Sequence, residues 1–361
     1  MRRRELVSDK VFFILIMMLM IFSLVVLYSA TFKMQEISFA ADYWTKQSMW
    51  MAIGFIVMIL IGNTDYRNIG HLAYFIYGLN LLLVIAVLFI GKNICGAKRW
   101  ISMGGITIQP SEFMKMSLII MLGWYLYSTK ESKNWLQKMF VAGIIVFIPM
   151  IFILKEPDLG TSLVFIPIYF SMLFVAGIPV KYLFSVVFAG IACSPIAWMF
   201  LREYQKKRIY IFLNPHQDQF GSGWTIIQSK IAIGSGAFFG KGFLKGTQTQ
   251  LDFLPEHHTD FIFSVIGEEF GFLGGAAIII LFFLIITRAI NIAHQSYDEL
   301  GKLLITGICS MIAFQVFVNI GMTFGIMPTT GIPLPLVSYG GSSMLSILIG
   351  FGIVLAVRRK W

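Results

Sequence analysis

The chain has 361 residues, of which 57% are hydrophobic and only 13% are charged, and its mean hydropathy is +0.79. This balance excludes an ordinary soluble domain and indicates a polytopic membrane protein. A net charge of +10 is compatible with anionic lipid head groups, but the basic residues follow the membrane spans and form no nucleic-acid-binding module, so no nucleic-acid partner is expected.

Apolar runs that are long enough to cross a bilayer, or nearly so, recur along the whole chain. We predict an all-α fold with about ten transmembrane helices in a single transmembrane domain, residues 1–361. The first run is followed by no small-residue cleavage site, which favours a retained span over a removed signal peptide. The runs are Val11–Ala30, Trp44–Ile61, Leu72–Ile90, Phe113–Tyr127, Met139–Leu154, Leu159–Ala176, Tyr182–Leu201, Phe261–Ile286, Leu303–Phe324 and Ser342–Val357.

The basic residues indicate the orientation. If both termini are cytoplasmic, fourteen Lys and Arg residues lie on the inner side and six lie in short outer loops, as the positive-inside rule requires. Residues 202–259, between helices 7 and 8, then form a large extracytoplasmic loop with seven more basic residues and four acids. The basic residues of this loop favour a phosphate or pyrophosphate ligand at the outer surface. The alternative is that they only keep the loop soluble.

The first polar motif at the outer level is Gly96 to Lys115, which enters the fourth span with Arg99, Gln109, Glu112 and Lys115. Glu112 and Lys115 are three positions apart, so they share a helix face and can form an ion pair. An ion pair that only holds helices together is the alternative to a role in binding.

The segment KEPDLGTS, residues 155–162, is a second polar break. Pro157 and Gly160 interrupt the helical pattern, and Asp158 lies at the start of the sixth span. Broken helices with charge at membrane depth are tolerated where they line a cavity. We therefore expect this turn to contribute to a polar site.

The long outer loop contains seven glycines between residues 221 and 246, interleaved with lysines that include Lys241 and Lys245. Glycine lets backbone N–H groups approach an anion, although the spacing matches no Walker A or dinucleotide pattern. Residues 224–233 are predicted to form a short interfacial helix anchored by Trp224. The later segment 328–343, rich in proline and glycine, predicts a rigid outer loop whose serines could cap the last helix.

Asp260 stands where this polar segment meets the eighth span. An ionisable group at a bilayer boundary is costly unless it is paired or hydrated, so its presence is a functional hypothesis. The alternative is that Thr259 or Asp260 caps the helix that begins at Phe261. A helix N-terminus and nearby cations would lower the pKa of Asp260, whereas burial would raise it.

Several catalytic signatures are absent from the sequence. There is no HExxH, CxxC, GxSxG, Walker A or Asp-X-Asp motif, which disfavours common zinc and serine hydrolases, ATP-driven pumps and many nucleotide-sugar transferases. His257 and His258 are adjacent, so on regular structure they point in different directions and do not predict a metal site. The three cysteines are scattered and predict no disulfide framework.

Six ordered segments are spread over nearly the whole chain: GAKRWI with QPSE, KEPDLGTS, FLNPHQDQFGSGW, QSKIAIGSG, GKGFLKGTQTQLDFLPEHHTDFIFSVIGEE and PLPLVSYGGSS. Together they resemble the SEDS family and its rod-shape branch. The division branch shares most of them, but the short N-terminal tail and the wording FLPEHHTDFIF favour the elongation branch.

The resemblance implies a peptidoglycan glycosyltransferase of the bacterial inner membrane that polymerises lipid II on the outer face during cell elongation. It also implies a class B penicillin-binding protein, which supplies transpeptidation, and other elongation-complex membrane proteins as partners. The essential aspartate of the family's tDFIF motif falls on Asp260. The family's other polar site positions fall on Arg99, Gln109, Glu112, Lys115 and Asp158.

Together these readings predict an inverting transfer. Asp260 is the candidate general base for the 4-hydroxyl of lipid II, which attacks the anomeric carbon of the strand and displaces undecaprenyl pyrophosphate. A divalent cation, Mg²⁺ or Mn²⁺, bound with the pyrophosphate is left open. Glu268 and Glu269 lie too deep to be second catalytic carboxylates and are expected to line the cavity or pack helices. The candidates for neutralising pyrophosphate are Arg99, Lys115, Arg208, Lys241 and Lys245.

Two other functions fit parts of the pattern. A lipid II flippase would also show intramembrane charge and broken helices, but no repeated half is evident and the charged motifs concentrate at the outer level. A scaffold that only positions the penicillin-binding partner leaves Asp260 without a role.

Overall fold

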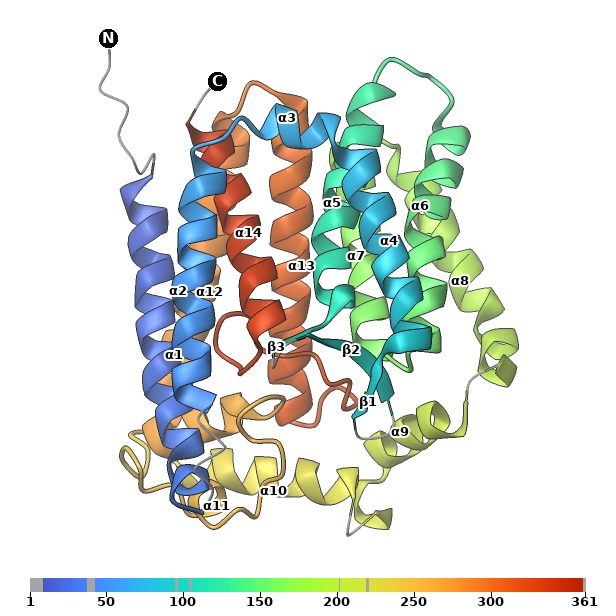
Figure 1. Cartoon of the computed structure of the whole chain (residues 1–361). Helices are drawn as coiled ribbons and strands as arrows, with labels where there is room; N and C mark the ends of the chain where they lie inside the picture. The colour runs from blue at the N-terminus through green and yellow to red at the C-terminus, as the bar shows by residue number, and fades with distance from the viewer. Residues whose placement is uncertain are drawn as a thin grey trace.

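The computed structural model describes residues 9–37, 43–94, 97–103, 106–200, 202–218 and 221–359. Its long helices run side by side in one bundle, with the two ends of the chain at one face (Figure 1). A small sheet and the short helices of the long loop lie at the opposite face. We call these the termini face and the loop face. The basic residues before Asp9 and after Arg359 lie outside the described residues.

Each of the predicted spans coincides with a helix of the bundle. Within the described ranges, seven helices are long and apolar enough to cross a membrane, and α7 and α8 are shorter apolar helices. The remaining one, α5, is less apolar because it carries charged side chains into the bundle interior. The helices are α1 (Lys10–Ile37), α2 (Tyr43–Gly62), α4 (Ala73–Ile90), α5 (Pro110–Ser128), α6 (Trp135–Lys155), α7 (Leu159–Val175), α8 (Val180–Phe200), α12 (Ile262–Gln295), α13 (Glu299–Thr323) and α14 (Gly341–Arg358).

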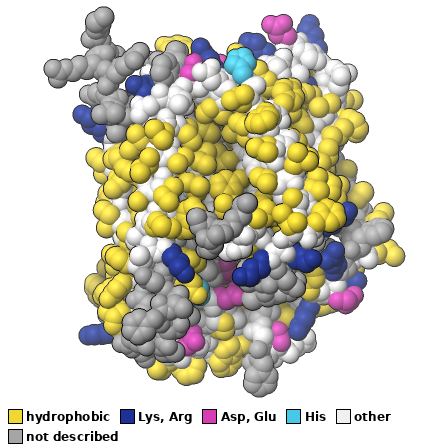
Figure 2. Space-filling view, in the orientation of Figure 1, with side chains coloured by type: hydrophobic (Ala, Val, Ile, Leu, Met, Phe, Trp, Pro, Cys, Tyr) yellow, Lys and Arg dark blue, Asp and Glu magenta, His cyan; other side chains and the backbone are white. Residues whose placement is uncertain are grey.

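The surface of the bundle matches its expected solvent. On the face that Figure 2 shows, hydrophobic side chains form a broad band across the middle, and charged side chains gather above and below it. Large apolar residues of the long helices, such as Phe89, Phe140 and Phe188, are exposed. Exposed apolar surface of this extent is stable only against lipid, so the chain is a multi-pass helical membrane protein, as predicted.

The loop face is built from short elements. Strands β1, β2 and β3 form an antiparallel sheet in that order, with Lys92 opposite Trp100 and Ile101 opposite Ile108. The helix predicted at residues 224–233 is present as α10. The short elements are α3 (Tyr66–His71) at the termini face and β1 (Lys92–Ile94), β2 (Ala97–Met103), β3 (Ile106–Ile108), α9 (Glu203–Leu213), the 3₁₀ turn η1 (Pro215–Gln217), α10 (Ser222–Ser235) and α11 (Thr247–Gln250) at the loop face.

Helix α12 is interrupted at Gly271, which has a φ of +63°. Residues 237–242 of the glycine-rich loop supply the hydrogen bonds that the break removes. The N–H of Lys241 donates to the carbonyl of Glu268 at 2.9 Å, and the N–H of Phe272 donates to the carbonyl of Ala237 at 2.9 Å. Non-helical backbone at membrane depth requires such internal partners, so this loop and the first part of α12 form one unit.

Gly240 allows this close contact, because a Cβ placed on it would lie 2.1 Å from the carbonyl oxygen of Glu269 and its φ is +82°. We expect Gly240→Ala to destabilise the protein by about 1–3 kcal/mol or more, through strain and loss of the loop contact. Thermal unfolding in detergent measures the effect. Gly78→Ala in α4 is the control, since a Cβ placed on Gly78 would have no neighbour within 4 Å; an equal loss in both variants would contradict the expectation.

Candidate functional site

Asp260 lies in the turn that precedes α12, at the loop face. The N-cap of α12 is Phe261, and among the described residues no side-chain hydrogen bond caps the first turn. The hydroxyl of Thr259 donates instead to the carbonyl of Glu256 at 3.2 Å. The capping interpretation of Thr259 and Asp260 is therefore wrong, and the carboxylate is left available for another use.

Charged groups from several elements surround the Asp260 carboxylate. Burial, with the neighbouring negative charges of Glu256 and Asp158, raises the pKa of Asp260 to about 7, while Arg208 and Arg99 act in the lowering direction. The residue keeps part of its surface exposed. Of the two opposing effects anticipated from the sequence, burial is the stronger, so this carboxyl group exchanges a proton near neutral pH.

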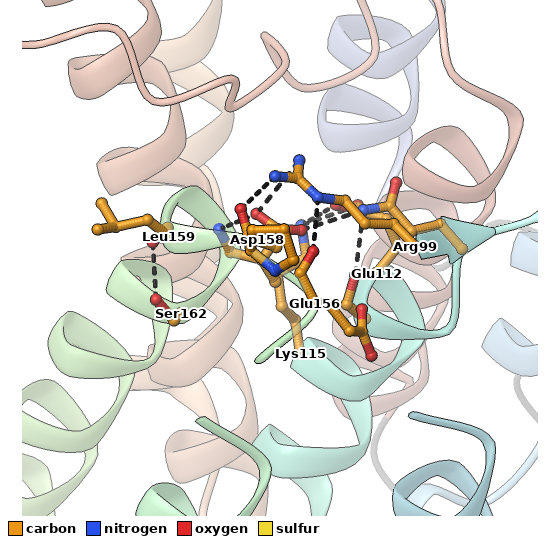
Figure 3. A network of polar contacts seen from close by, with 11 residues as sticks. Arg99, Glu112, Lys115, Glu156, Asp158, Leu159 and Ser162 are labelled. Atoms are coloured by element: carbon orange, nitrogen blue, oxygen red, sulfur yellow. Dashed lines mark hydrogen bonds and ion pairs between the residues drawn. The ribbon is translucent and has the colours of Figure 1, made fainter. Parts of the chain in front are cut away.

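Arg99, on β2, reaches from the sheet to the turn between α6 and α7 (Figure 3). Its Nε donates to the carbonyl of Glu156 at 3.1 Å, and its Nη2 donates to the carbonyl of Pro157. Its Nη1 lies 4.0 Å from a carboxylate oxygen of Asp158. The sheet therefore holds this guanidinium group in place over the predicted polar break.

Asp158 is the N-cap of α7 and organises the same turn. It accepts hydrogen bonds from the N–H of Thr161 at 3.1 Å and from the Thr161 hydroxyl at 2.9 Å. The amide nitrogen of Gln109, the residue before α5, donates to Asp158 at 3.2 Å. The structure thus brings Arg99 and Gln109, from the motif Gly96 to Lys115, together with Asp158 of the motif KEPDLGTS.

Glu112 lies in the first turn of α5, Lys115 follows three residues later, and the two pair as predicted. The Lys115 Nζ lies 2.8 Å from both carboxylate oxygens of Glu112, and Lys115 and Glu112 are only 1% and 3% exposed. Ser346 of α14 donates to the backbone carbonyl of Glu112 at 2.9 Å. Their position below Asp158 and Arg99 makes this pair a buried support of the site (Figure 3).

Glu156 is a site residue that was not predicted from the sequence. It is 1% exposed, and neither carboxylate oxygen has a hydrogen-bond partner in the described part of the chain. Burial and the charge of Asp158 raise the pKa of Glu156 to about 8, with Arg99 acting in the lowering direction. The only signal in the sequence was a charge directly before Pro157 at the end of an apolar run.

The basic residues of the long loop occupy different surroundings. Lys241 donates to the carboxylate of Glu268 at 2.7 Å and to the hydroxyl of Thr247 at 2.7 Å, so its charge is already paired. Lys245 is exposed, and Arg208 is partly buried on α9. Of these three, Arg208 is the one whose charge acts on Asp260.

The two acids inside α12 hold neighbouring segments. Besides Lys241, Glu268 accepts hydrogen bonds from the N–H of Gln248 at 2.9 Å and the hydroxyl of Thr249 at 2.9 Å. Glu269 accepts one from Ser29 of α1 at 2.6 Å. Both acids therefore serve packing, one of the two roles anticipated for them.

The side chains that the structure describes do not form a metal centre among themselves. Within the described ranges, no group of three or more His, Cys, Asp and Glu side chains is arranged to hold a metal ion. The ring nitrogens of His257 lie 2.7 and 2.8 Å from the carbonyl oxygens of Leu254 and Ala30, which occupies both of them. The donor set at Asp260 therefore does not by itself fit a resident divalent cation.

The arrangement has a definite chemical capacity. A carboxyl group that titrates near neutral pH can accept a proton from a hydroxyl group, and two guanidinium groups near it can stabilise an anion. Asp260 lies directly before α12, a helix that is long and apolar enough to cross a membrane. The site is therefore suited to substrates that combine a lipid tail with a charged head group.

Comparison with known proteins agrees with these features. Residues 9–361 match the cell cycle protein family of FtsW, RodA and SpoVE. The peptidoglycan glycosyltransferase MrdB of Escherichia coli K12 is 36% identical over 350 residues, covering 97% of this chain and 93% of MrdB. The peptidoglycan glycosyltransferase RodA of Treponema pallidum is 34% identical, covering 98% of each chain.

The fold agrees as well. One chain of a solved peptidoglycan synthase complex, described as coordinating polymerization and crosslinking, superposes with a TM-score of 0.82 at 31% identity, covering 97% of both chains. The resemblance found in the six sequence motifs is thus confirmed over almost the whole length. The chain belongs to the FtsW, RodA and SpoVE family, the SEDS proteins.

Proposed function

We propose that this chain is a peptidoglycan glycosyltransferase that polymerises lipid II into glycan strands. The observation that carries the proposal is the environment of Asp260, whose carboxyl group has a pKa of about 7 and is acted on by Arg208 and Arg99. A base that is partly deprotonated at the working pH, beside fixed cations, is what transfer from a pyrophosphate donor requires. The membership of a family with named peptidoglycan glycosyltransferases supports the same reading.

In the proposed mechanism, Asp260 takes the proton from the 4-hydroxyl of the incoming lipid II sugar. The oxygen attacks the anomeric carbon of the growing strand, and the bond to undecaprenyl pyrophosphate breaks. One in-line displacement inverts the anomeric configuration and needs no second carboxylate. Arg99 and Arg208 stabilise the departing pyrophosphate, and Lys245 is a further candidate because it is exposed.

Other residues support the site in this proposal. Asp158 and Gln109 hold Arg99 in position, and the Glu112–Lys115 pair supports them from below. Lys241 and Lys115 are paired with Glu268 and Glu112, so they would bind pyrophosphate only if the substrate displaced those partners. A Mg²⁺ or Mn²⁺ ion, if it takes part, would arrive with the pyrophosphate, and no step is assigned to it.

The proposed base makes a prediction about pH. Because Asp260 acts in its deprotonated form, polymerisation should rise with pH through about 7 and fall by roughly tenfold per unit below it. Rates measured between about pH 5.5 and pH 9 test this. Arg208→Gln should move the midpoint upward, because Arg208 lowers the pKa, whereas Lys207→Gln, at an exposed neighbour paired with Asp218, should not. A flat profile would contradict the assignment of the base.

We also propose that the protein acts in cell elongation, in the inner membrane, with both termini in the cytoplasm. The elongation role is supported by the rod-shape motif wording and by the RodA relative, and the orientation by the charge distribution. A class B penicillin-binding protein is the proposed partner, since a similar chain belongs to a complex that joins polymerization to crosslinking. Other elongation-complex membrane proteins would bind the same assembly.

The test is polymerisation of labelled lipid II by the purified chain with its cognate penicillin-binding protein. We expect a polymer that muramidase degrades. The matched assay is translocation of labelled lipid II across liposomes that contain the same preparation. Translocation without polymer would favour the flippase and overturn the proposal.

A further inference from the structure

Three successive backbone carbonyls lead up to Asp260, and each has its own donor from a distant part of the chain. The carbonyl of His258 accepts from the N–H of Tyr339 at 3.0 Å. The carbonyl of Thr259 accepts from the hydroxyl of Ser338 at 2.5 Å. The carbonyl of Asp260 itself accepts from the side-chain amide of Asn319 at 2.9 Å.

Asn319 occupies a special position among these donors. It lies near the end of α13, it is 0% exposed, and its amide nitrogen also donates to the carbonyl of Ile332 at 2.8 Å. One side chain thus joins the turn before α12 to the loop between α13 and α14. Gly331, in that loop, stands close to the Asp260 carboxylate, since a Cβ placed on it would lie 3.5 Å from Oδ2.

The loop that carries the other donors is itself fixed. Gln47 of α2 donates to the carbonyl of Ser338 at 3.3 Å and accepts from the N–H of Gly340 at 3.2 Å. Ser23 of α1 donates to the carbonyl of Val337 at 3.3 Å. The donors are therefore held by α1, α2 and α13, and the turn at Asp260 has little freedom to shift.

We infer that Asn319, with Ser338 and the Tyr339 N–H, is a positioning residue that holds the Asp260 backbone so that the carboxylate stays near Arg99 and Arg208. The inference rests on the proposed function. It explains why a buried amide is placed on a membrane-spanning helix, where an unpaired polar group is costly. Displacements of about 1 Å in a reacting group can lower rates by about a hundredfold.

The positioning of this turn should also affect the pH profile. The charged groups that act on Asp260 are Glu256 of its own segment, Asp158 before α7, Arg99 of the sheet and Arg208 of α9. Burial is the main reason that the pKa is raised. If the turn loosens and the carboxylate becomes more solvated, the midpoint of the acid limb should fall below that of the wild type.

The experiment compares Asn319→Leu with Gln315→Leu, assayed as complexes with the cognate penicillin-binding protein after matched yield and thermal stability are verified. Gln315 lies one turn earlier on α13, is 0% exposed, and its amide has no hydrogen-bond partner in the described residues. We expect Asn319→Leu to lower the polymerisation rate by about ten- to a hundredfold and to shift the acid limb to lower pH. Gln315→Leu should change neither.

Ser338→Ala is the second variant, for the case that Asn319→Leu does not fold. It removes the donor to Thr259, so it should shift the acid limb in the same direction by a smaller amount. Folded variants with an unchanged rate and an unchanged midpoint would overturn the positioning role. Retention of full polymerisation by Asp260→Asn would instead overturn the proposed function, so the two failures are distinguishable.

Discussion

Asp260→Asn should lower polymerisation of lipid II by about a hundred- to ten-thousandfold, the contribution expected of a general base. The substitution keeps the size of the side chain but removes its ability to accept a proton. Because Asp260 does not cap α12, the helix should keep its start and the protein its stability. The measurement is the initial rate of polymer formation at equal amounts of folded complex.

The control is Asp252→Asn. Asp252 belongs to the same loop, but its side chain is 73% exposed, and its carboxylate lies 3.8 Å from the Nδ1 of His257. This variant should polymerise at the wild-type rate. If Asp260→Asn kept the rate while binding of the penicillin-binding protein failed, the scaffold interpretation would gain and the catalytic one would be lost.

Breaking the buried pair in α5 should have the largest effect on stability. Removing one partner of a buried ion pair typically costs about 3–5 kcal/mol, because the other charge is left uncompensated. Glu112→Gln and Lys115→Met each do this at residues that are almost fully buried. Thermal unfolding in detergent, followed by the loss of monodisperse protein, measures the cost.

The double variant Glu112→Gln/Lys115→Met separates charge from packing. It removes both charges together, so it should recover most of the stability lost in either single variant. Lys206→Met is the surface control, because its partner Glu203 is 93% exposed, and it should cost less than about 1 kcal/mol. A double variant that is as unstable as the sum of the two single ones would show that the pair is not a coupled unit.

The transmembrane architecture could be predicted because lipid imposes one strong rule, an apolar run of about 20 residues for each span. The rule found even α5, whose Glu112 and Lys115 make it less apolar than its neighbours. It does not fix helix ends: α1 continues to Ile37, beyond the predicted Ala30, since a helix that leaves the bilayer no longer needs apolar residues.

The sheet and the donors around Asp260 could not be predicted in the same way. Strands β1 and β3 have three residues each, too few for an alternating pattern to be recognised. Asn319 is 59 positions from Asp260 in the chain, and a single Asn in an apolar run carries no mark of its partner. In the sequence, Glu156 looks like an ordinary charged residue of a loop, and only the fold shows that it is buried.

The resemblance to family motifs predicted some of the site residues that the general sequence patterns could not. It brought Arg99, Gln109, Asp158 and Asp260 together before any coordinates did, and the first three lie in contact. It did not reveal that Lys241 is paired with Glu268. The sequence of a glycine-rich loop does not distinguish a lysine that binds a ligand anion from one that is paired with a carboxylate of the same chain. Roles for Lys241, Lys245 and Arg208 in pyrophosphate binding stay predictions.

The break in α12 also has a consequence for how the protein is made. Glu268 and Glu269 lie inside this span, and their partners are Lys241 and Thr249 in the preceding loop and Ser29 in α1. A nascent α12 that entered lipid alone would carry two unpaired acids and the open backbone groups beside Gly271. Biogenesis therefore favours insertion of this segment only after the preceding loop has folded against it and α1 is present.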